Sequence, residues 1–178
     1  MTAEQRTSSP SGIDGARQRA LADDFDAELR PLIPTALRLA AAMRLDPQDA
    51  EDAVQSAALR AWSKRGNRRP GTELRPWFLA IVANQCRETR RAHWASVLRF
   101  ADPPEVERPT GDTAGAIDLV NALRRMPPRI RLAVVARYYL DLPFDEVAAI
   151  CGCSVDAAKA RVRRGIQTLT TTLRFQES

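Results

Sequence analysis

Apolar residues recur every three or four positions along most of the chain from about residue 23, and no useful length alternates between apolar and polar residues. The first spacing places apolar side chains on one face of an α-helix, whereas alternation indicates a strand. The chain is therefore predicted to be all-α. Helical segments are expected from 23 to a break at 45–47, from 47 to a loop at 65–73, from 74 through a basic run at 87–91, and then at 117–126, 128–139, 144–151 and 154–174.

Several of these segments begin with recognisable signals. Asp46 and Ser154 stand where an N-cap is expected, since their side-chain oxygens can accept a hydrogen bond from a free N–H of the first turn. Pro47 follows at the first helical position, where a missing N–H is tolerated. Pro31 and Pro34 lie inside the first apolar stripe, so they are expected to delay or kink that helix.

Composition divides the chain into two helical parts. Residues 1–20 are polar, with Ser, Gly and Pro, and are predicted to form a disordered tail. Three prolines and one glycine at 100–114, with little apolar content, predict a linker at 98–115. The predicted architecture is two small helical domains, at 21–97 and 116–178, joined by a flexible linker.

Charge is distributed in blocks. Residues 21–59 contain 3 Arg or Lys against 8 Asp or Glu, a net charge of −5, whereas residues 60–95 contain 9 against 2, a net of +7. Residues 116–178 contain 10 against 6, a net of +4. Two basic segments suggest two contacts with a polyanion such as nucleic acid. The acidic block suggests a contact with a basic or polar protein surface.

The segment PFDEVAAICGCSVDAAKARV, at 143–162, has the layout of a helix-turn-helix, with Gly152 at the turn. The second helix of this motif enters the DNA major groove in many regulators. An ordinary helical hairpin is the alternative, and the basic outer face favours DNA. The apolar stripe of the last helix is expected at Val155, Ala158, Val162, Ile166 and Leu169, opposite a face with four nearby cations, Lys159, Arg161, Arg163 and Arg164.

The cysteine, histidine and glycine content argues against other classes. Three cysteines are an odd count, which fits a reducing compartment without a disulfide framework. Cys151 and Cys153, with distant Cys86 and His93, make a poor zinc site, so buried small hydrophobes are the better interpretation. No Gly-rich phosphate loop or catalytic constellation is present, so neither an enzyme nor a cofactor is expected. No secretory signal or membrane-length apolar run is visible, which predicts a cytoplasmic protein.

Three stretches together resemble a known family. The stretch MPPRIRLAVVARYYLDLPFDEVAAICGCSVDAAKARVRRGIQTL resembles region 4 of bacterial sigma factors of the extracytoplasmic-function (ECF) group, in the sigma-70 family. DAEDAVQSAALRAW resembles their region 2.2, and LRPWFLAIVANQCRETRR resembles regions 2.3–2.4. The resemblance covers about 23–96 and 116–174. It implies a factor that binds core RNA polymerase and directs promoter-specific initiation at −10 and −35 elements.

The resemblance also implies partners and residue roles. Core RNA polymerase is expected to bind through the clamp helices of its largest subunit and its flap, promoter DNA is the second partner, and an anti-sigma factor is a third. Glu51 and Asp52 have an alternative role, since carboxylates also stabilise the first turns of a helix. The implied polymerase contacts are Glu51, Asp52, Gln55 and Arg60.

The implied DNA contacts fall in both halves. Trp62 and Trp77 could stack on bases but lie in apolar stripes, which favours a core role. The −10 candidates are Arg65, Asn67, Arg68, Arg69, Asn84, Arg87, Arg90 and Arg91, and the −35 candidates are Lys159, Ala160, Arg163, Arg164 and Arg137.

One departure from the family pattern and one rival function remain. Ala157 and Ala160 replace hydroxyl residues of the family's recognition helix, which predicts an altered −35 preference. A free-standing helix-turn-helix regulator would explain residues 116–174 but would leave the first half without a task.

Overall fold

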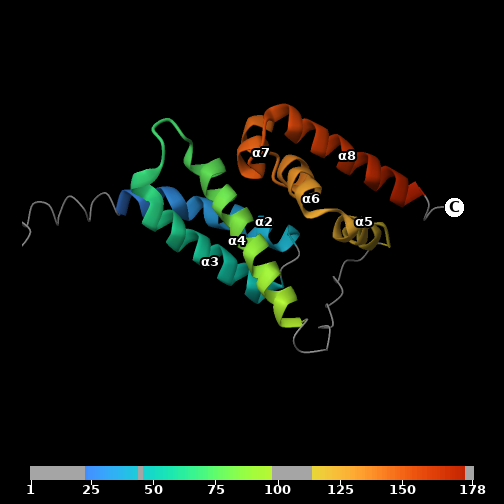
Figure 1. Cartoon of the computed structure of the whole chain (residues 1–178), viewed down its shortest axis with the longest axis horizontal. Helices are drawn as coiled ribbons and strands as arrows, with labels where there is room; N and C mark the ends of the chain where they lie inside the picture. The colour runs from blue at the N-terminus through green and yellow to red at the C-terminus, as the bar shows by residue number, and fades with distance from the viewer. Residues whose placement is uncertain (1–22, 44–45, 98–113, 175–178) are drawn as a thin grey trace, which may run out of the picture.

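The computed structural model describes residues 23–43, 46–97 and 114–174 of the chain. Within these ranges all regular structure is helical, which confirms the all-α prediction (Figure 1). The predicted tail at 1–20 lies outside the described residues, as does all but the end of the predicted linker at 98–115.

The first helical segment is bent where the sequence places its prolines. Residues 23–29 are helical, a 3-10 turn η1 follows at Arg30–Leu32, and α2 spans Ile33–Ala42. Pro31 and Pro34 are the second residues of η1 and α2, within the first turn, where the missing N–H groups are tolerated. The predicted interruption is confirmed.

The next two helices form a long pair. α3 spans Pro47–Lys64, and the Asp46 carboxylate caps it by accepting a 2.7 Å hydrogen bond from the Asp49 N–H. A short turn η2 (Arg65–Asn67) leads through a loop to α4, which spans Leu74–Val97 and continues past the predicted basic run.

The second half contains α5 (Ala114–Arg125), α6 (Pro128–Val134), a π-helical turn η3 (Val135–Tyr139), α7 (Phe144–Cys151) and α8 (Val155–Arg174). The bounds of α7 match the prediction. The single helix predicted for 128–139 instead widens into η3 over its last turn.

Helix α8 buries a different stripe from the one predicted. Ala158, Val162, Gly165 and Leu169 are buried, whereas Ile166 is 36% exposed. Gly165 allows a close crossing with α6, because a Cβ there would overlap the Val134 side chain and lie 3.1 Å from Ile130 Cγ2.

The two halves share one hydrophobic core. α4 packs against α3 on one side and α7 on the other, so it forms the first half's contact with the second (Figure 1). Buried side chains of α3, α4 and α7 belong to one continuous cluster, and a smaller cluster joins α5, α6 and α8. The two predicted helical units are therefore in contact, which the sequence pattern did not indicate.

Candidate nucleic-acid and polymerase interfaces

The turn between α7 and α8 has the geometry of a helix-turn-helix. Gly152 adopts a left-handed conformation, with φ of 59°, and the Cys153 N–H donates a 3.0 Å hydrogen bond to the Ala148 carbonyl. α8 begins two residues later, where the Ser154 hydroxyl accepts a 3.2 Å bond from the Ala157 N–H. The predicted cap and turn are confirmed.

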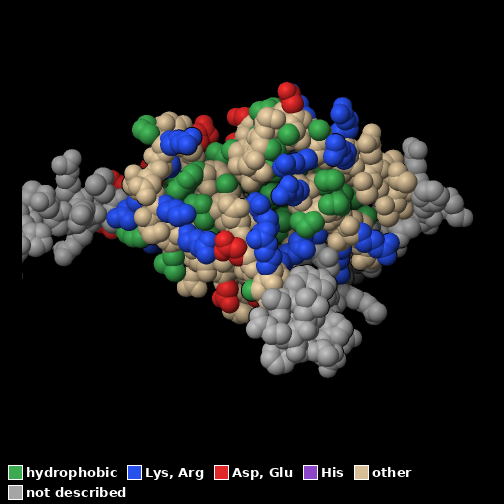
Figure 2. Space-filling view, viewed as in Figure 1, with side chains coloured by type: hydrophobic (Ala, Val, Ile, Leu, Met, Phe, Trp, Pro, Cys, Tyr) green, Lys and Arg blue, Asp and Glu red, His purple; other side chains and the backbone are tan. Residues whose placement is uncertain are grey.

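The outer face of α8 is basic. Lys159, Arg163 and Arg164 are exposed and Ala160 is half-buried, on the side opposite the buried stripe. The Lys159 ammonium lies 6.0 Å from the centroid of the Phe144 ring on α7. Figure 2 shows Lys and Arg side chains gathered across the face on which α4 and α8 lie. This arrangement leaves these three cations free to contact an anionic partner.

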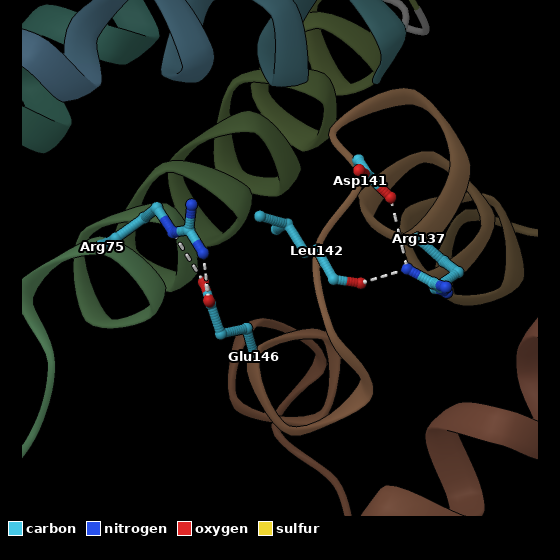
Figure 3. Close-up of polar contacts among 5 residues, drawn as sticks. All are labelled: Arg75, Arg137, Asp141, Leu142 and Glu146. Atoms are coloured by element: carbon cyan, nitrogen blue, oxygen red, sulfur yellow. Dashed lines mark hydrogen bonds and ion pairs between the residues drawn. The ribbon is translucent and has the colours of Figure 1, made fainter.

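Arg137, the fifth −35 candidate, has intramolecular partners. Its Nη1 donates to the Leu142 carbonyl at 3.0 Å and to the Asp141 carboxylate at 3.5 Å (Figure 3). Its guanidinium lies 5.3 Å from the Phe144 ring centroid. Asp141 has a positive φ of 51°, so Arg137 stabilises an unusual turn that places α7.

Part of the −10 set lines a cavity beside α4. Asn84, Arg87 and Arg91 of α4 face the end of α3 across a space of about 260 Å³. Arg60 and Lys64 of α3 also line it, and the Glu88 carboxylate, which pairs with Arg60, offsets part of their positive charge. A small, open, basic space of this kind suits a phosphate or a polar base edge. Arg90 is half-buried and is not among the lining residues.

The loop candidates lie apart from this cavity. Arg65 stacks on the Trp62 ring at 4.4 Å and donates a 2.8 Å hydrogen bond to the Trp62 carbonyl, so it is held at the end of α3. Asn67 and Arg69 are exposed and Arg68 is half-buried. Trp62 also packs against the core, together with Trp77.

The predicted polymerase contacts divide into two groups. Glu51, Asp52 and Gln55 are exposed on one face of α3, whereas Arg60 projects toward α4 and pairs with Glu88 at 2.8 Å. Leu59 lies on the first face and is 66% exposed. It was not predicted, although its place four residues after Gln55 could have indicated it.

Within the described ranges, hydrogen bonds from Arg75 and Arg131 join the halves, and neither was predicted. Arg75 of α4 forms an ion pair with Glu146 of α7, with Nε and Oε2 2.8 Å apart (Figure 3). This hydrogen bond raises the pKa of Arg75. Arg131 of α6 is 1% exposed, and its Nη2 donates to the Met43 carbonyl at 3.4 Å.

The cysteines are packed side chains. Cys86 is fully buried, and burial raises the pKa of its thiol to about 12. Cys151 and Cys153 are half-buried. Among the described residues no three His, Cys, Asp or Glu side chains come together as a metal site. The His93 side chain is not among those described.

Each half of the chain matches the model of a known protein family. The family model Sigma-70 region 2 matches residues 29–96, and Sigma-70, region 4 matches residues 116–169. These matches cover both halves in the order that the sequence predicts.

Individual relatives agree. The chain is 32% identical over 126 residues to the RNA polymerase sigma factor CarQ of Myxococcus xanthus, covering 67% of this chain and 72% of that protein. It is 30% identical over 139 residues to the ECF RNA polymerase sigma factor SigM of Mycobacterium tuberculosis, covering 78% and 71%.

Solved structures share the fold. The sigma factor RpoE from Bartonella quintana, in complex with the anti-sigma factor NepR, matches with a TM-score of 0.69 and 24% identity, over 85% of this chain and 97% of that one. CnrH, in complex with the cytosolic domain of CnrY, matches with a TM-score of 0.61 and 23% identity, over 88% and 89%.

The chain belongs to the sigma-70 family of RNA polymerase sigma factors, and within it to the ECF group. It is a promoter-directing transcription initiation factor. Sigma factors catalyse no reaction themselves, so the family confirms that the chain is not an enzyme. The match at 29–96 also accounts for the first half of the chain, which the alternative of a free-standing helix-turn-helix regulator leaves unexplained. No helix in the described ranges is long and apolar enough to cross a bilayer.

Proposed function

We propose that this chain has three separate binding surfaces, one for core RNA polymerase, one for the −10 element and one for the −35 element. Residues 21–97 act as region 2 and residues 116–178 as region 4, separated by the segment 98–115. The observation that supports this division most strongly is the ordered match of two family models, combined with an acidic exposed face on α3 and a basic exposed face on α8.

The exposed face of α3 is the proposed polymerase surface. Glu51, Asp52 and Gln55 offer carboxylate and amide groups to a basic, polar helix partner, and Leu59 adds an apolar side chain at the same face. An exposed leucine surrounded by polar groups suits an interface whose centre is apolar and whose rim is polar. Arg60 is assigned instead to the contact with Glu88.

Helix α4 and the loop before it are the proposed −10 surface. Asn84, Arg87 and Arg91 line one basic cavity, which suits a strand whose bases have left the duplex. Arg68, Arg69 and Arg90 extend the positive surface toward phosphates, and Asn67 adds a neutral amide donor beside them.

Helix α8 is the proposed −35 surface. Lys159 and Arg163 are placed to contact base edges in the major groove, where Arg or Lys with guanine is the commonest specific pair. Arg164 contacts the backbone, and Arg137 positions α7 through its bond to the Leu142 carbonyl.

An anti-sigma protein is the proposed regulatory partner, on the analogy of the RpoE–NepR complex. Because both the polymerase and the template are intracellular, we also place the protein in the cytoplasm.

The test is gel filtration of the full chain with bacterial core RNA polymerase at moderate salt. Stoichiometric co-elution is expected, and Asp52→Arg should reduce the co-eluting fraction because the reversed charge repels a basic partner. Asp145→Arg, the same charge change on an exposed residue of α7, should co-elute normally. Failure of the wild-type chain to co-elute, or equal loss in both variants, would contradict the assignment.

A further inference from the structure

Two cysteines lie together in the turn of the helix-turn-helix. Cys151 is the last residue of α7, Cys153 lies two positions later, and the left-handed Gly152 stands between them. Both side chains are half-buried, so the pair is neither sealed in the core nor fully in solvent. The proposed polymerase and DNA surfaces make no use of these thiols.

The backbone holds the two cysteines within reach of one ion. Residues two positions apart have Cα atoms at most about 7 Å apart even in an extended chain, and the left-handed turn at Gly152 is more compact than that. The Gly152 N–H donates to the Ala149 carbonyl at 3.2 Å and the Cys153 N–H to the Ala148 carbonyl at 3.0 Å, which fixes the turn. An ion held by two thiolates spans sulfur atoms about 4.6 Å apart, twice a metal–sulfur bond of about 2.3 Å. Side chains on this turn can reach that separation.

Positive charge lies beside the Cys151 thiol. The Arg161 side chain of α8 hydrogen-bonds to this thiol, and its Nη1 also donates to the Cys151 carbonyl at 3.3 Å. Burial raises the pKa of the Cys151 thiol, as does the charge of Cys153, whereas the positive charges of Arg161 and Arg87 lower it. Two sulfur atoms and two guanidinium groups are therefore neighbours at this turn.

The number of ligands selects the class of ion. Thiolates prefer soft metal ions, and a structural zinc or iron–sulfur site takes four ligands. In the part of the chain that the structure describes, no third His, Cys, Asp or Glu side chain joins the pair. A soft monovalent ion such as Cu(I) is different, because two thiolates complete a linear site for it. Cu(I) is also the form of copper that a reducing compartment favours.

We propose that the Cys151 and Cys153 thiolates form a binding site for Cu(I), with Arg161 as the residue that balances its charge. Binding exchanges two S–H protons for the ion: both protons pass to solvent, two copper–sulfur bonds form, and no electron is transferred. The bound group carries a net charge of −1. The Arg161 guanidinium stabilises that charge through its hydrogen bond to the sulfur, and the charge of Arg87 adds to the effect.

The test is competition for Cu(I) between the full chain and the coloured chelator bicinchoninate, under anaerobic and reducing conditions. The wild-type chain should withdraw one equivalent of Cu(I) from the chelator. Cys151→Ser and Cys153→Ser should each weaken Cu(I) affinity about a thousandfold, because two linked ligands are reduced to one. Circular dichroism checks that each variant is folded, and either variant suffices if the other is not.

Matched variants separate the site from general thiol and charge effects. Cys86→Ala removes a fully buried thiol outside the pair and should leave Cu(I) affinity unchanged. Arg161→Gln should weaken affinity about tenfold, because the bound group loses its nearest counter-charge. Arg163→Gln makes the same change at an exposed position of α8 and should have no effect.

Three results would overturn the proposal. The first is Cu(I) binding that is equally strong in wild type and in the two serine variants, which indicates adventitious copper only. The second is a loss of binding in Cys86→Ala as large as in the serine variants. The third is equal affinity in wild type and Arg161→Gln, which removes Arg161 from the site. None of these results bears on polymerase or promoter binding, so the proposed function is tested separately.

Discussion

Helices α3 and α8 are built in the same way but present opposite surfaces. Each begins at a side-chain cap, Asp46 for α3 and Ser154 for α8. Each turns small residues toward its neighbours, with Ala57 fully buried on α3 and Ala158 and Gly165 buried on α8. Small buried residues allow close helix packing, so the caps and buried faces account for the fold of both helices.

The exposed faces differ. The exposed face of α3 has Glu51, Asp52 and the 66% exposed Leu59, whereas that of α8 has Lys159 and Arg163. Because neither exposed face contributes to the core, each is free to match a different partner, which we propose is polymerase for α3 and DNA for α8. Changes on the buried faces should therefore alter stability, and changes on the exposed faces should alter one binding reaction each.

The largest effect is expected from filling the close crossing of α8 and α6. Gly165→Val places new atoms into the Val134 side chain, and overpacking of this kind destabilises by about 2–3 kcal/mol. Urea unfolding followed by circular dichroism measures the loss. Gly66→Ala is the control, because nothing lies within 4 Å of that position. Equal stability of the two variants would show that α6 and α8 do not cross this closely.

The next effect concerns the two exposed faces. Asp52→Arg should weaken polymerase binding about 30-fold, or about 2 kcal/mol, by charge repulsion at the interface. Arg163→Ala should leave polymerase binding unchanged and weaken binding to −35 duplex by a similar factor, through loss of a base contact. Fluorescence anisotropy with each partner measures both. A variant that weakens polymerase binding and −35 duplex binding equally would contradict the proposal that the two partners use separate surfaces.

Smaller and equal effects are expected at the two caps. Asp46→Ala and Ser154→Ala each remove an acceptor for a first-turn N–H, which destabilises by about 1 kcal/mol. Thermal unfolding measures both, and Ser63→Ala, in the last turn of α3, is the control away from either cap, since it removes only the bond from Ser63 Oγ to the Arg60 carbonyl of the same helix. A loss at one cap only would mean that the two helices do not begin in the same way.

The smallest effect distinguishes backbone contacts from base contacts. Arg90→Ala should lower the salt dependence of promoter binding by a slope of about one, with little change in sequence preference. Lys159→Ala should change sequence preference at the −35 element. Titrations at several salt concentrations on matched and mismatched duplexes separate the two. Identical behaviour of the variants would contradict their assignment to different kinds of contact.

Local features of the fold were predictable because their causes are local. The N-caps at Asp46 and Ser154, the turn at Gly152 and the interruption near Pro31 each depend on the residue types within a few positions of the chain. The buried stripe of α8 was not predictable in this way, because apolar periodicity alone places Ile166 in the stripe rather than its neighbour Gly165. The close approach of α6 decides between them, and that approach is a property of the packed structure.

The contacts between elements that are distant along the chain could not be predicted from the sequence. Arg75 and Glu146 each look like an ordinary surface charge, and nothing in their neighbourhoods shows that residues 71 positions apart will pair. Arg60 was grouped with the acidic residues of α3, and its pairing with Glu88 of α4 was not predicted. Of the proposed site, the charged residues were predictable by type and spacing, whereas their division among surfaces required the fold.

The most direct test of the central claim is transcription in vitro by core polymerase plus this protein, on templates with randomised DNA upstream of a reporter. Sequencing of the transcripts and their templates should show two enriched blocks, near −10 and −35. Arg163→Ala should alter only the upstream block, and Asn84→Ala only the downstream one. Initiation without any enriched block, or no initiation beyond that of core polymerase alone, would contradict the account.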